Sequence, residues 1–192
     1  MTTEQYKPIY DWFTARPAAC RLLKVTDKVL PILVAGTYLQ LLCQLLADCV
    51  YEMVSGIIYC CPVDVVPSIS VADRRFYEAL YVPAAVLLIG SVLRRIIDAP
   101  RPYQQPDFVP LVAKNKTGRS LPSRHSFSAG CIAVVGWMVD PLVGLWLTAA
   151  AVLICITRVL VGVHHVRDVL SGFVLGTTLC VVGISLLRYL LI

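Results

Sequence analysis

The stretch PSRHSFSAGCIAVVGWMVDPLVGLWLTAAAVLICITR, residues 122–158, decides the fold of this chain. It holds two apolar runs, residues 127–139 and 142–156, and Asp140-Pro141 predicts a turn between them. A basic, histidine-bearing patch precedes the first run, and an arginine follows closely after the second. Cations are costly beside a bilayer, so cations at the ends of apolar runs indicate a task at the membrane surface.

The whole chain is rich in apolar residues. Of its 192 residues, 58% are hydrophobic and 15% are charged, whereas a soluble domain carries about 25% charged residues. One soluble core of this length cannot hide so much apolar surface, so lipid must cover part of it. The formal net charge of +5 is concentrated around the polar patches. This clustering argues against a nucleic-acid partner and indicates a local site for an anionic ligand.

Five apolar segments predict an all-α, integral membrane helical bundle. They cover residues 29–47, 76–93, 127–139, 142–156 and 169–187. The third and fourth are shorter than the about 20 residues of a span, and they reach that length only if polar residues at their ends continue the helices. Residues 50–69 are ambiguous because Glu52, Pro62 and Pro67 interrupt them. They form a short span, a re-entrant piece or an interfacial loop, so we expect five to six transmembrane helices.

Residues 1–28 predict an interfacial, partly helical N-terminal lead. A cleavable signal is not expected, because charges are scattered through this region and the apolar run begins only near Val29. Pro17 is expected to interrupt the lead. Residues 29–192 are then expected to form a single transmembrane domain.

The charges outside the apolar segments predict an orientation. If residues 50–69 form a span, the N-terminal lead, the Asp73-Arg74-Arg75 loop and Arg188 fall on one side of the membrane and the polar patches on the other. The positive-inside rule makes the first side cytoplasmic. We therefore expect a functional site on the extracytoplasmic face of the plasma membrane. The basic residues of the proline-rich loop, residues 98–123, are attributed to the chemistry of that site.

Eight cysteines raise the alternatives of disulfides or a metal site. Cys43, Cys131, Cys155 and Cys180 lie inside apolar runs, and no Cys-x-x-Cys pair occurs in the sequence. This placement favours small buried hydrophobic residues over a structural zinc site. The sequence also lacks a cluster of carboxylates able to hold two metal ions. We therefore expect neither a metal nor another cofactor.

His164 and Asp168 are four residues apart, which is one turn if the backbone is helical. A carboxylate at this spacing can accept a proton from one ring nitrogen. That contact fixes the tautomer and leaves the other nitrogen free as a base or a nucleophile. The alternative is a purely structural His–Asp pair at the start of a helix.

The patch around His125 suits a phosphate group. Ser123 or Ser126 is predicted to cap a helix that begins near Phe127, and the free N–H groups of such a helix start favour an anion. His125 at that position can pass a proton to a leaving oxygen. The alternative is a plain helix cap beside an exposed histidine.

Two further arginines, Arg94 and Arg101, are separated by six residues, and Pro102 follows the second. Guanidinium groups offer forked donors that match phosphate oxygens. Anchoring to lipid headgroups is the alternative for such arginines.

Taken together, the three patches resemble the signatures of the type 2 phosphatidic acid phosphatase superfamily, also called lipid phosphate phosphatases. Those signatures are Lys-x6-Arg-Pro, Pro-Ser-Gly-His and Ser-Arg-x5-His-x3-Asp. Similar residues occur here in the same order at residues 94–102, 122–125 and 157–168, in about the second half of the chain. Three positions depart from the pattern: Arg94 replaces lysine, Arg124 replaces glycine and Thr157 replaces serine.

The resemblance implies a metal-independent lipid phosphatase with its active site at the membrane–water interface. It implies that His164 is the nucleophile and forms a phosphohistidine, that Asp168 orients it, and that His125 acts as acid and then as base. The phosphate-binding residues that it implies are Arg94, Arg101, Ser123, Arg124 and Arg158.

The substrates that the resemblance implies are phosphatidic acid, phosphatidylglycerol phosphate or polyprenyl diphosphates such as the cell-wall carrier lipid. We favour the last two over lipid A. Neither the headgroup nor the oligomeric state follows from the sequence. Two other functions would use the same residues: a lipid phosphotransferase, and a non-enzymatic anionic-lipid binding or transport protein. The paired repeats typical of transporters are not evident in this sequence.

Overall fold

The computed structural model describes residues 1–59 and 71–190. In these residues the chain forms six α-helices and a short 3-10 helix, Pro102–Gln104. The α-helices are α1 Thr3–Thr14, α2 Pro17–Tyr59, α3 Val71–Ile97, α4 Arg124–Val139, α5 Pro141–Leu160 and α6 Val166–Leu190. No strand occurs in the described part of the chain, so the prediction of an all-α fold is confirmed.

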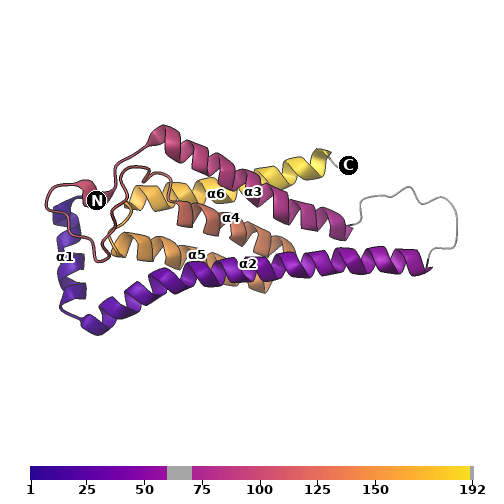
Figure 1. Ribbon diagram of the computed structural model, residues 1–192, viewed down its shortest axis with the longest axis horizontal. Helices are drawn as coiled ribbons and strands as arrows, with labels where there is room; N and C mark the ends of the chain where they lie inside the picture. The colour runs from indigo at the N-terminus through magenta and orange to yellow at the C-terminus, as the bar shows by residue number, and fades with distance from the viewer. Residues whose placement is uncertain (60–70, 191–192) are drawn as a thin grey trace.

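The five longer helices form an elongated bundle, and α1 lies across one end of it (Figure 1). Each of the five predicted apolar segments lies within one of these helices, α2 to α6. The central helix is α4, which contacts α2, α3, α5 and α6. Asp140 ends α4 and caps α5, because its side chain accepts hydrogen bonds from the backbone N–H groups of Leu142 and Val143 at 2.8 and 3.0 Å. The predicted turn at Asp140-Pro141 is confirmed.

Four segments of the described chain are long and apolar enough to cross a membrane: Pro17–Ser55, Arg74–Gln104, Pro141–Leu160 and Val166–Leu190. The fifth long helix, α4, has 16 residues and lies among the others. Outward-facing side chains of the bundle are apolar; Ile32 is 69% exposed and Leu142 is 76% exposed. An apolar surface of this extent is what lipid covers, so the protein is an integral membrane protein.

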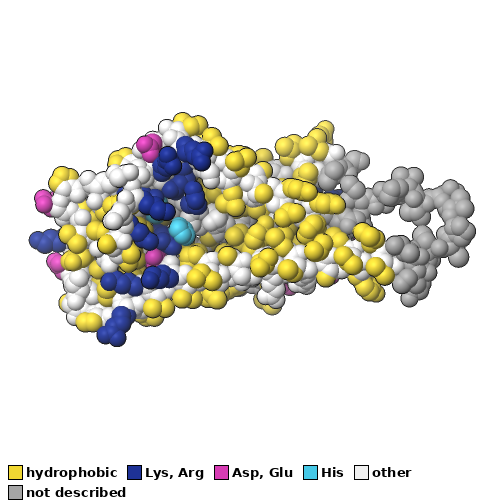
Figure 2. Space-filling view, in the orientation of Figure 1, with side chains coloured by type: hydrophobic (Ala, Val, Ile, Leu, Met, Phe, Trp, Pro, Cys, Tyr) yellow, Lys and Arg dark blue, Asp and Glu magenta, His cyan; other side chains and the backbone are white. Residues whose placement is uncertain are grey.

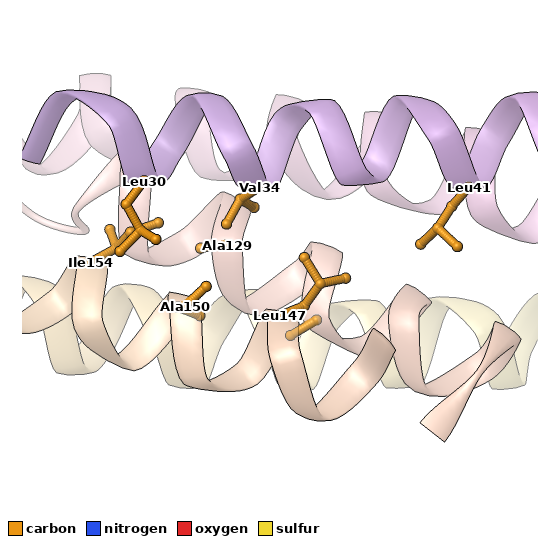
Figure 3. Close-up of a cluster of buried hydrophobic side chains, with 9 residues drawn as sticks. Leu30, Val34, Leu41, Ala129, Leu147, Ala150 and Ile154 are labelled. Atoms are coloured by element: carbon orange, nitrogen blue, oxygen red, sulfur yellow. The ribbon is translucent and has the colours of Figure 1, made fainter. Parts of the chain in front are cut away.

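One part of the core joins α2 to α4 and α5. Leu30, Val34 and Leu41 share one face of α2, because they are four and seven residues apart. They point toward Ala129 on α4 and toward Leu147, Ala150 and Ile154 on α5 (Figure 3). The alanines allow α2 to approach closely, so the long N-terminal helix is fixed against the half of the chain that carries the polar patches.

Two glycines bring α6 against α4. A Cβ atom on Gly172 would lie 2.8 Å from the carbonyl oxygen of Ser123, and one on Gly176 would collide with the carbonyl of Phe127. Small residues spaced by four positions let two membrane helices approach at their backbones. The close approach also lets the N–H of Ser123 donate a hydrogen bond of 2.8 Å to the carbonyl of Asp168. The starts of α4 and α6 are therefore tied together.

The structure corrects the predicted placement of the N-terminal lead. The chain runs as one helix through residues 17–59, so part of the lead and residues 50–59 belong to the same helix as the first apolar segment; residues 60–69 lie outside the described residues. The helix α2 runs along the bundle once, so its two ends lie at opposite ends of the bundle. The helix α1, which precedes it, therefore lies at the end that carries the polar patches. Tyr6 on α1 donates a hydrogen bond of 2.9 Å to the carbonyl of Leu160. The lead does not share a side with Arg74 and Arg188.

The cysteines divide between the core and the lipid-facing surface. Cys131 and Cys180 are buried and Cys155 is half-buried, as expected for small hydrophobic residues. Cys43 is exposed, so its predicted burial is wrong. At this exposed position on α2, a small apolar side chain can face lipid.

Candidate active site

A pocket of about 890 Å³ lies at the end of the bundle that α1 crosses. Six of the predicted site residues line it: Arg94, Arg101, Arg124, His125, Arg158 and His164. Three further cations, Lys114, Lys116 and Arg119, share this wall with a single carboxylate, Asp98. Figure 2 shows Lys and Arg side chains gathered around a histidine at this end, while hydrophobic side chains cover much of the rest of this face. Such a surplus of cations favours an anionic ligand.

His164 lies two residues before the start of α6, and Asp168 lies in the first turn of that helix. Both side chains are buried. The distance from His164 Nδ1 to Asp168 Oδ2 is 3.7 Å, which is too long for a direct hydrogen bond. Ser120 fills this gap. Its hydroxyl donates to Asp168 Oδ2, and its oxygen lies 3.3 Å from His164 Nδ1.

Sequence reasoning missed Ser120. The residue lies in the proline-rich loop, two positions before the Pro-Ser-Arg-His patch, and that proximity is the only signal that could have identified it. Its burial is complete, and its backbone N–H donates to the carbonyl of Ala99 at 2.9 Å. The loop therefore delivers the hydroxyl to one fixed position.

The backbone also holds Asp168. The N–H of His165 donates to Asp168 Oδ2 at 3.0 Å, and the exposed Arg167 side chain lies 3.6 Å from the other carboxylate oxygen. With the bond from Ser123 to its carbonyl, Asp168 is fixed at both its side chain and its backbone. The carboxylate lies behind His164 and does not line the pocket.

The helix that carries His125 begins at Arg124, three residues earlier than predicted. Ser123 precedes it but makes no side-chain cap; its hydroxyl accepts a hydrogen bond of 3.1 Å from Ser126. The predicted capping role of Ser123 and Ser126 is therefore wrong, because the two hydroxyls pair with each other inside the protein. Ser123 is fully buried and does not line the pocket. His125 does line it, close to the N-terminus of α4, where free N–H groups and the helix dipole favour an anion.

Two arginines hold the proline-rich loop over the pocket. Arg94, in the last turn of α3, donates to the carbonyls of Pro122 and Arg119, the second at 2.5 Å. Arg101 donates from Nε to the carbonyl of Gly118 at 3.0 Å. A guanidinium has five N–H donors, so both side chains keep donors for a ligand. Their acceptors within the protein are neutral carbonyls, which leave the positive charges uncompensated.

Arg158, in the last turn of α5, has a different partner. Its Nη2 donates to the carbonyl of Asp27 at 3.0 Å, and its Nε lies 3.3 Å from Asp27 Oδ1. Asp27 is buried on α2 and was not predicted as a site residue. The only feature of the sequence that could have identified it is its position, as a lone carboxylate two residues before the first apolar segment. The N-terminal half of the chain thus holds one arginine of the pocket wall in place.

Both pocket histidines are favoured in their neutral form. Burial lowers the pKa of His164 below its ordinary value, and the charges of Arg101 and Arg94 act in the same direction against the opposing effect of Asp168. Burial, together with nearby cations such as Arg158, also lowers the pKa of His125, which lies outside the four candidate spans. Neutral imidazoles carry a lone pair at pH 7, so either ring can act as a nucleophile or a base. No three His, Cys, Asp or Glu side chains in the described residues group so as to hold a metal ion.

The fold and the site define a class of protein: a helical membrane protein whose cationic pocket is lined by two histidines, one of them backed by a buried carboxylate. The chain belongs to the PAP2 superfamily, whose family model matches residues 76–191. The resemblance seen in the three sequence patches is confirmed.

Individual relatives agree with this assignment. Phosphatidylglycerophosphatase B of Bacillus subtilis (strain 168) is 37% identical over 103 residues, which cover 48% of this chain and 48% of that protein. The match thus spans about half the length of this curated relative.

Two solved structures share the fold. The crystal structure of a transmembrane PAP2 type phosphatidylglycerolphosphate phosphatase from Bacillus subtilis has a TM-score of 0.50 at 23% identity, covering 96% of this chain and 92% of that one. Aquifex aeolicus LpxE has a TM-score of 0.52 at 17% identity, covering 86% of this chain and 93% of that one.

Proposed function

We propose that this protein is a metal-independent membrane lipid phosphatase that acts through a phosphohistidine. The observation that carries the proposal is that His164 and His125 face one cationic pocket at the end of a lipid-covered bundle. Family membership and the similarity to phosphatidylglycerophosphatase B support a phosphate ester of a lipid as the substrate. Residues 29–192 would form the phosphatase domain, with residues 1–28 as its N-terminal lead.

In the first step, the Nε2 lone pair of His164 attacks phosphorus, and the bond from phosphorus to the lipid oxygen breaks. A phosphate dianion among the cations raises the pKa of His125, so this ring can carry the proton that the leaving oxygen receives. Arg94, Arg101, Arg124 and Arg158 would bind the phosphoryl oxygens while charge develops on them. Ser123 would act only through its position directly before the N-terminus of α4, because its hydroxyl pairs with that of Ser126 inside the protein.

In the second step, neutral His125 takes a proton from water, and the water oxygen attacks phosphorus. The bond from phosphorus to His164 Nε2 breaks, and its electron pair returns to the ring. Inorganic phosphate leaves, and His125 is protonated again. The arginines supply the charge neutralisation that Mg²⁺ provides in many phosphoryl-transfer enzymes.

The lipid tail would reach the pocket from within the membrane. An apolar groove of about 440 Å³ lies between α5 and α6, and its lining includes Leu160 and Val166. These residues lie four positions before and two positions after His164 in the chain, so the groove borders the two helix ends that flank the segment with the proposed nucleophile. Phosphatidylglycerol phosphate, phosphatidic acid and polyprenyl diphosphates combine a long apolar tail with the required phosphate.

The experiment that tests the proposal is a panel of these three lipids, assayed with purified protein in detergent for release of inorganic phosphate. We expect release from at least one lipid, loss of that release in His164→Ala, and no effect of EDTA. His165→Ala is the matched control, because His165 is buried beside the site but does not line the pocket. Lipid binding without any release would contradict the proposal and leave anionic-lipid binding as the function. Transfer of phosphate to an added alcohol in place of release would indicate a phosphotransferase.

We further propose that the site faces the extracytoplasmic side of the plasma membrane. Support comes from Arg74, Arg75 and Arg188 at the opposite end of the bundle and from the cations engaged around the pocket. The basic residues of the N-terminal lead lie at the pocket end and favour the opposite orientation. Labelling of Lys116→Cys by a membrane-impermeant maleimide on intact cells tests the orientation, with the unsubstituted chain as control. Labelling only after cell disruption would reverse the assignment.

A further inference from the structure

The hydroxyl of Ser120 lies between two groups of the proposed mechanism that do not touch each other. The gap of 3.7 Å from His164 Nδ1 to Asp168 Oδ2 is too long for a direct hydrogen bond. Ser120 contacts both atoms: it donates to Asp168 Oδ2, and its oxygen lies 3.3 Å from His164 Nδ1. All three residues are buried, so water does not compete for these contacts.

The positions of the protons follow from the contacts. Asp168 is an acceptor here, because Oδ2 also receives the N–H of His165 at 3.0 Å. The Ser120 hydroxyl has one hydrogen, and that hydrogen is committed to Asp168. The serine oxygen therefore faces His164 with a lone pair, and a hydrogen bond forms only if Nδ1 carries the proton. The opposite arrangement would place the bare serine oxygen against the carboxylate, which is repulsive.

We infer that Ser120 is a positioning residue that links His164 to Asp168 and holds the imidazole in its Nδ1–H tautomer, with Nε2 free to attack phosphorus. This inference rests on the proposed function for its catalytic consequence. The geometry of the linkage stands apart from it. When Nε2 forms its bond to phosphorus, the ring becomes positive, and the Nδ1–H can then donate more strongly through Ser120 toward the carboxylate.

The rigid setting of Ser120 suits this role. Its backbone N–H is bound to the carbonyl of Ala99 at 2.9 Å, and Arg94 binds the carbonyls of its neighbours Arg119 and Pro122. Because the backbone on both sides of Ser120 is held, its hydroxyl stays next to His164 and can favour one tautomer of the ring. The loop that covers the pocket thereby also orients the proposed nucleophile.

Nitrogen NMR of histidine-labelled protein in detergent tests the inference directly. The chain has three histidines, so the signal of His164 is assigned by its loss in His164→Asn. We expect the Nδ1–H form for His164 in the unsubstituted protein and a shift toward a mixture of tautomers in Ser120→Ala. Ser128→Ala is the matched control, because the Ser128 hydroxyl bonds only to the backbone of its own helix.

Kinetics give the second readout. Loss of a hydrogen bond to a group that becomes charged predicts a fall in kcat of about 10- to 100-fold in Ser120→Ala, with KM little changed. An Nε2–H tautomer in the unsubstituted protein, or an unchanged tautomer in Ser120→Ala, would overturn the inference. If no lipid releases phosphate but the tautomer shifts, the proposed function fails while the positioning of His164 by Ser120 stands.

Discussion

The two ends of the bundle bury charge in opposite ways. Far from the pocket, Glu78 of α3 is fully buried, and Arg188 of α6 binds both its oxygens at 2.8 and 2.9 Å. Arg74 lies 3.9 Å from the same carboxylate. At the pocket end, cations outnumber carboxylates, and Arg94 and Arg101 donate to neutral carbonyls.

The difference separates structure from function. At the far end, charges of opposite sign meet within the protein, so their contribution is to hold α3 and α6 together. At the pocket end, the protein supplies a carboxylate to Arg158 but only neutral carbonyls to Arg94 and Arg101, and a phosphate from outside can supply the missing negative charge. A neutralising substitution should therefore change stability at the far end and activity at the pocket end.

Among substitutions of charged residues, the largest effect on activity is expected for Arg101→Gln. Removing one cation that stabilises developing charge predicts a fall in kcat/KM of about 100- to 1000-fold. The thermal midpoint should hardly change, because Arg101 is bound to a neutral carbonyl and not to a carboxylate. Phosphate release and thermal unfolding in detergent measure the two quantities. Arg95→Gln, at an exposed arginine outside the pocket, serves as the control. A large loss of stability in Arg101→Gln would erase the distinction between the two ends.

Asp27→Asn should combine both behaviours, because Asp27 forms the ion pair of the pocket end that most resembles the far end. The substitution leaves Arg158 without its carboxylate, so we expect a lower thermal midpoint. We also expect kcat/KM to fall about 10-fold, because a displaced guanidinium binds the phosphoryl group in poorer geometry. An effect on activity without any loss of stability would show that Asp27 orients Arg158 but does not stabilise the fold.

Glu78→Gln should lower stability by about 1–3 kcal/mol, because it weakens a bidentate bond to Arg188. Phosphate release at a temperature below the transition should stay within about twofold of the unsubstituted protein, since the pair lies at the opposite end of the bundle. Arg75→Gln, at an exposed arginine near the start of α3, is the matched control. A large loss of kcat in folded Glu78→Gln would show that the far end takes part in catalysis.

Among the pocket arginines, the smallest effect on activity is expected for Arg124→Gly. Arg124 lines the pocket, but its side chain is exposed, and the family pattern has glycine at this position. We expect phosphate release to fall by about threefold, because the backbone N–H at the α4 start remains available to the phosphate. Complete inactivation would show that phosphate binding depends on the Arg124 side chain and that the backbone N–H at the α4 start cannot replace it.

The fold was largely predictable from apolar segments, because each of them had to be covered by lipid or by another helix. The N-terminal lead was misplaced for a physical reason: hydropathy identifies apolar stretches but does not show whether a helix stops between two of them. Residues 50–59 simply continue α2, despite Glu52. Because residues 50–59 do not cross the membrane separately, the N-terminal lead lies on the opposite side of the membrane from the predicted one.

The motif residues that line the pocket were predictable because their types and their spacing in the sequence match the signatures of a known family. Ser120 and Asp27 were not, since each acts through a partner that is distant in sequence, Asp168 and Arg158 respectively. A serine in a loop and a carboxylate before an apolar run have many ordinary explanations. Only the three-dimensional arrangement places them against the groups that they hold.

The helix α2 also bears on the depth of the pocket in the bilayer, through its length and the lysines near its start. Its candidate span of 39 residues measures about 58 Å at 1.5 Å per residue, against a hydrocarbon core of about 30 Å. The helix must therefore tilt or emerge from the hydrocarbon. The exposed Lys24 and Lys28 set the level at which it emerges, because their amines seek the headgroup layer. Asp27 lies between them and holds Arg158, so we expect the phosphate pocket to lie at the level of the lipid phosphates.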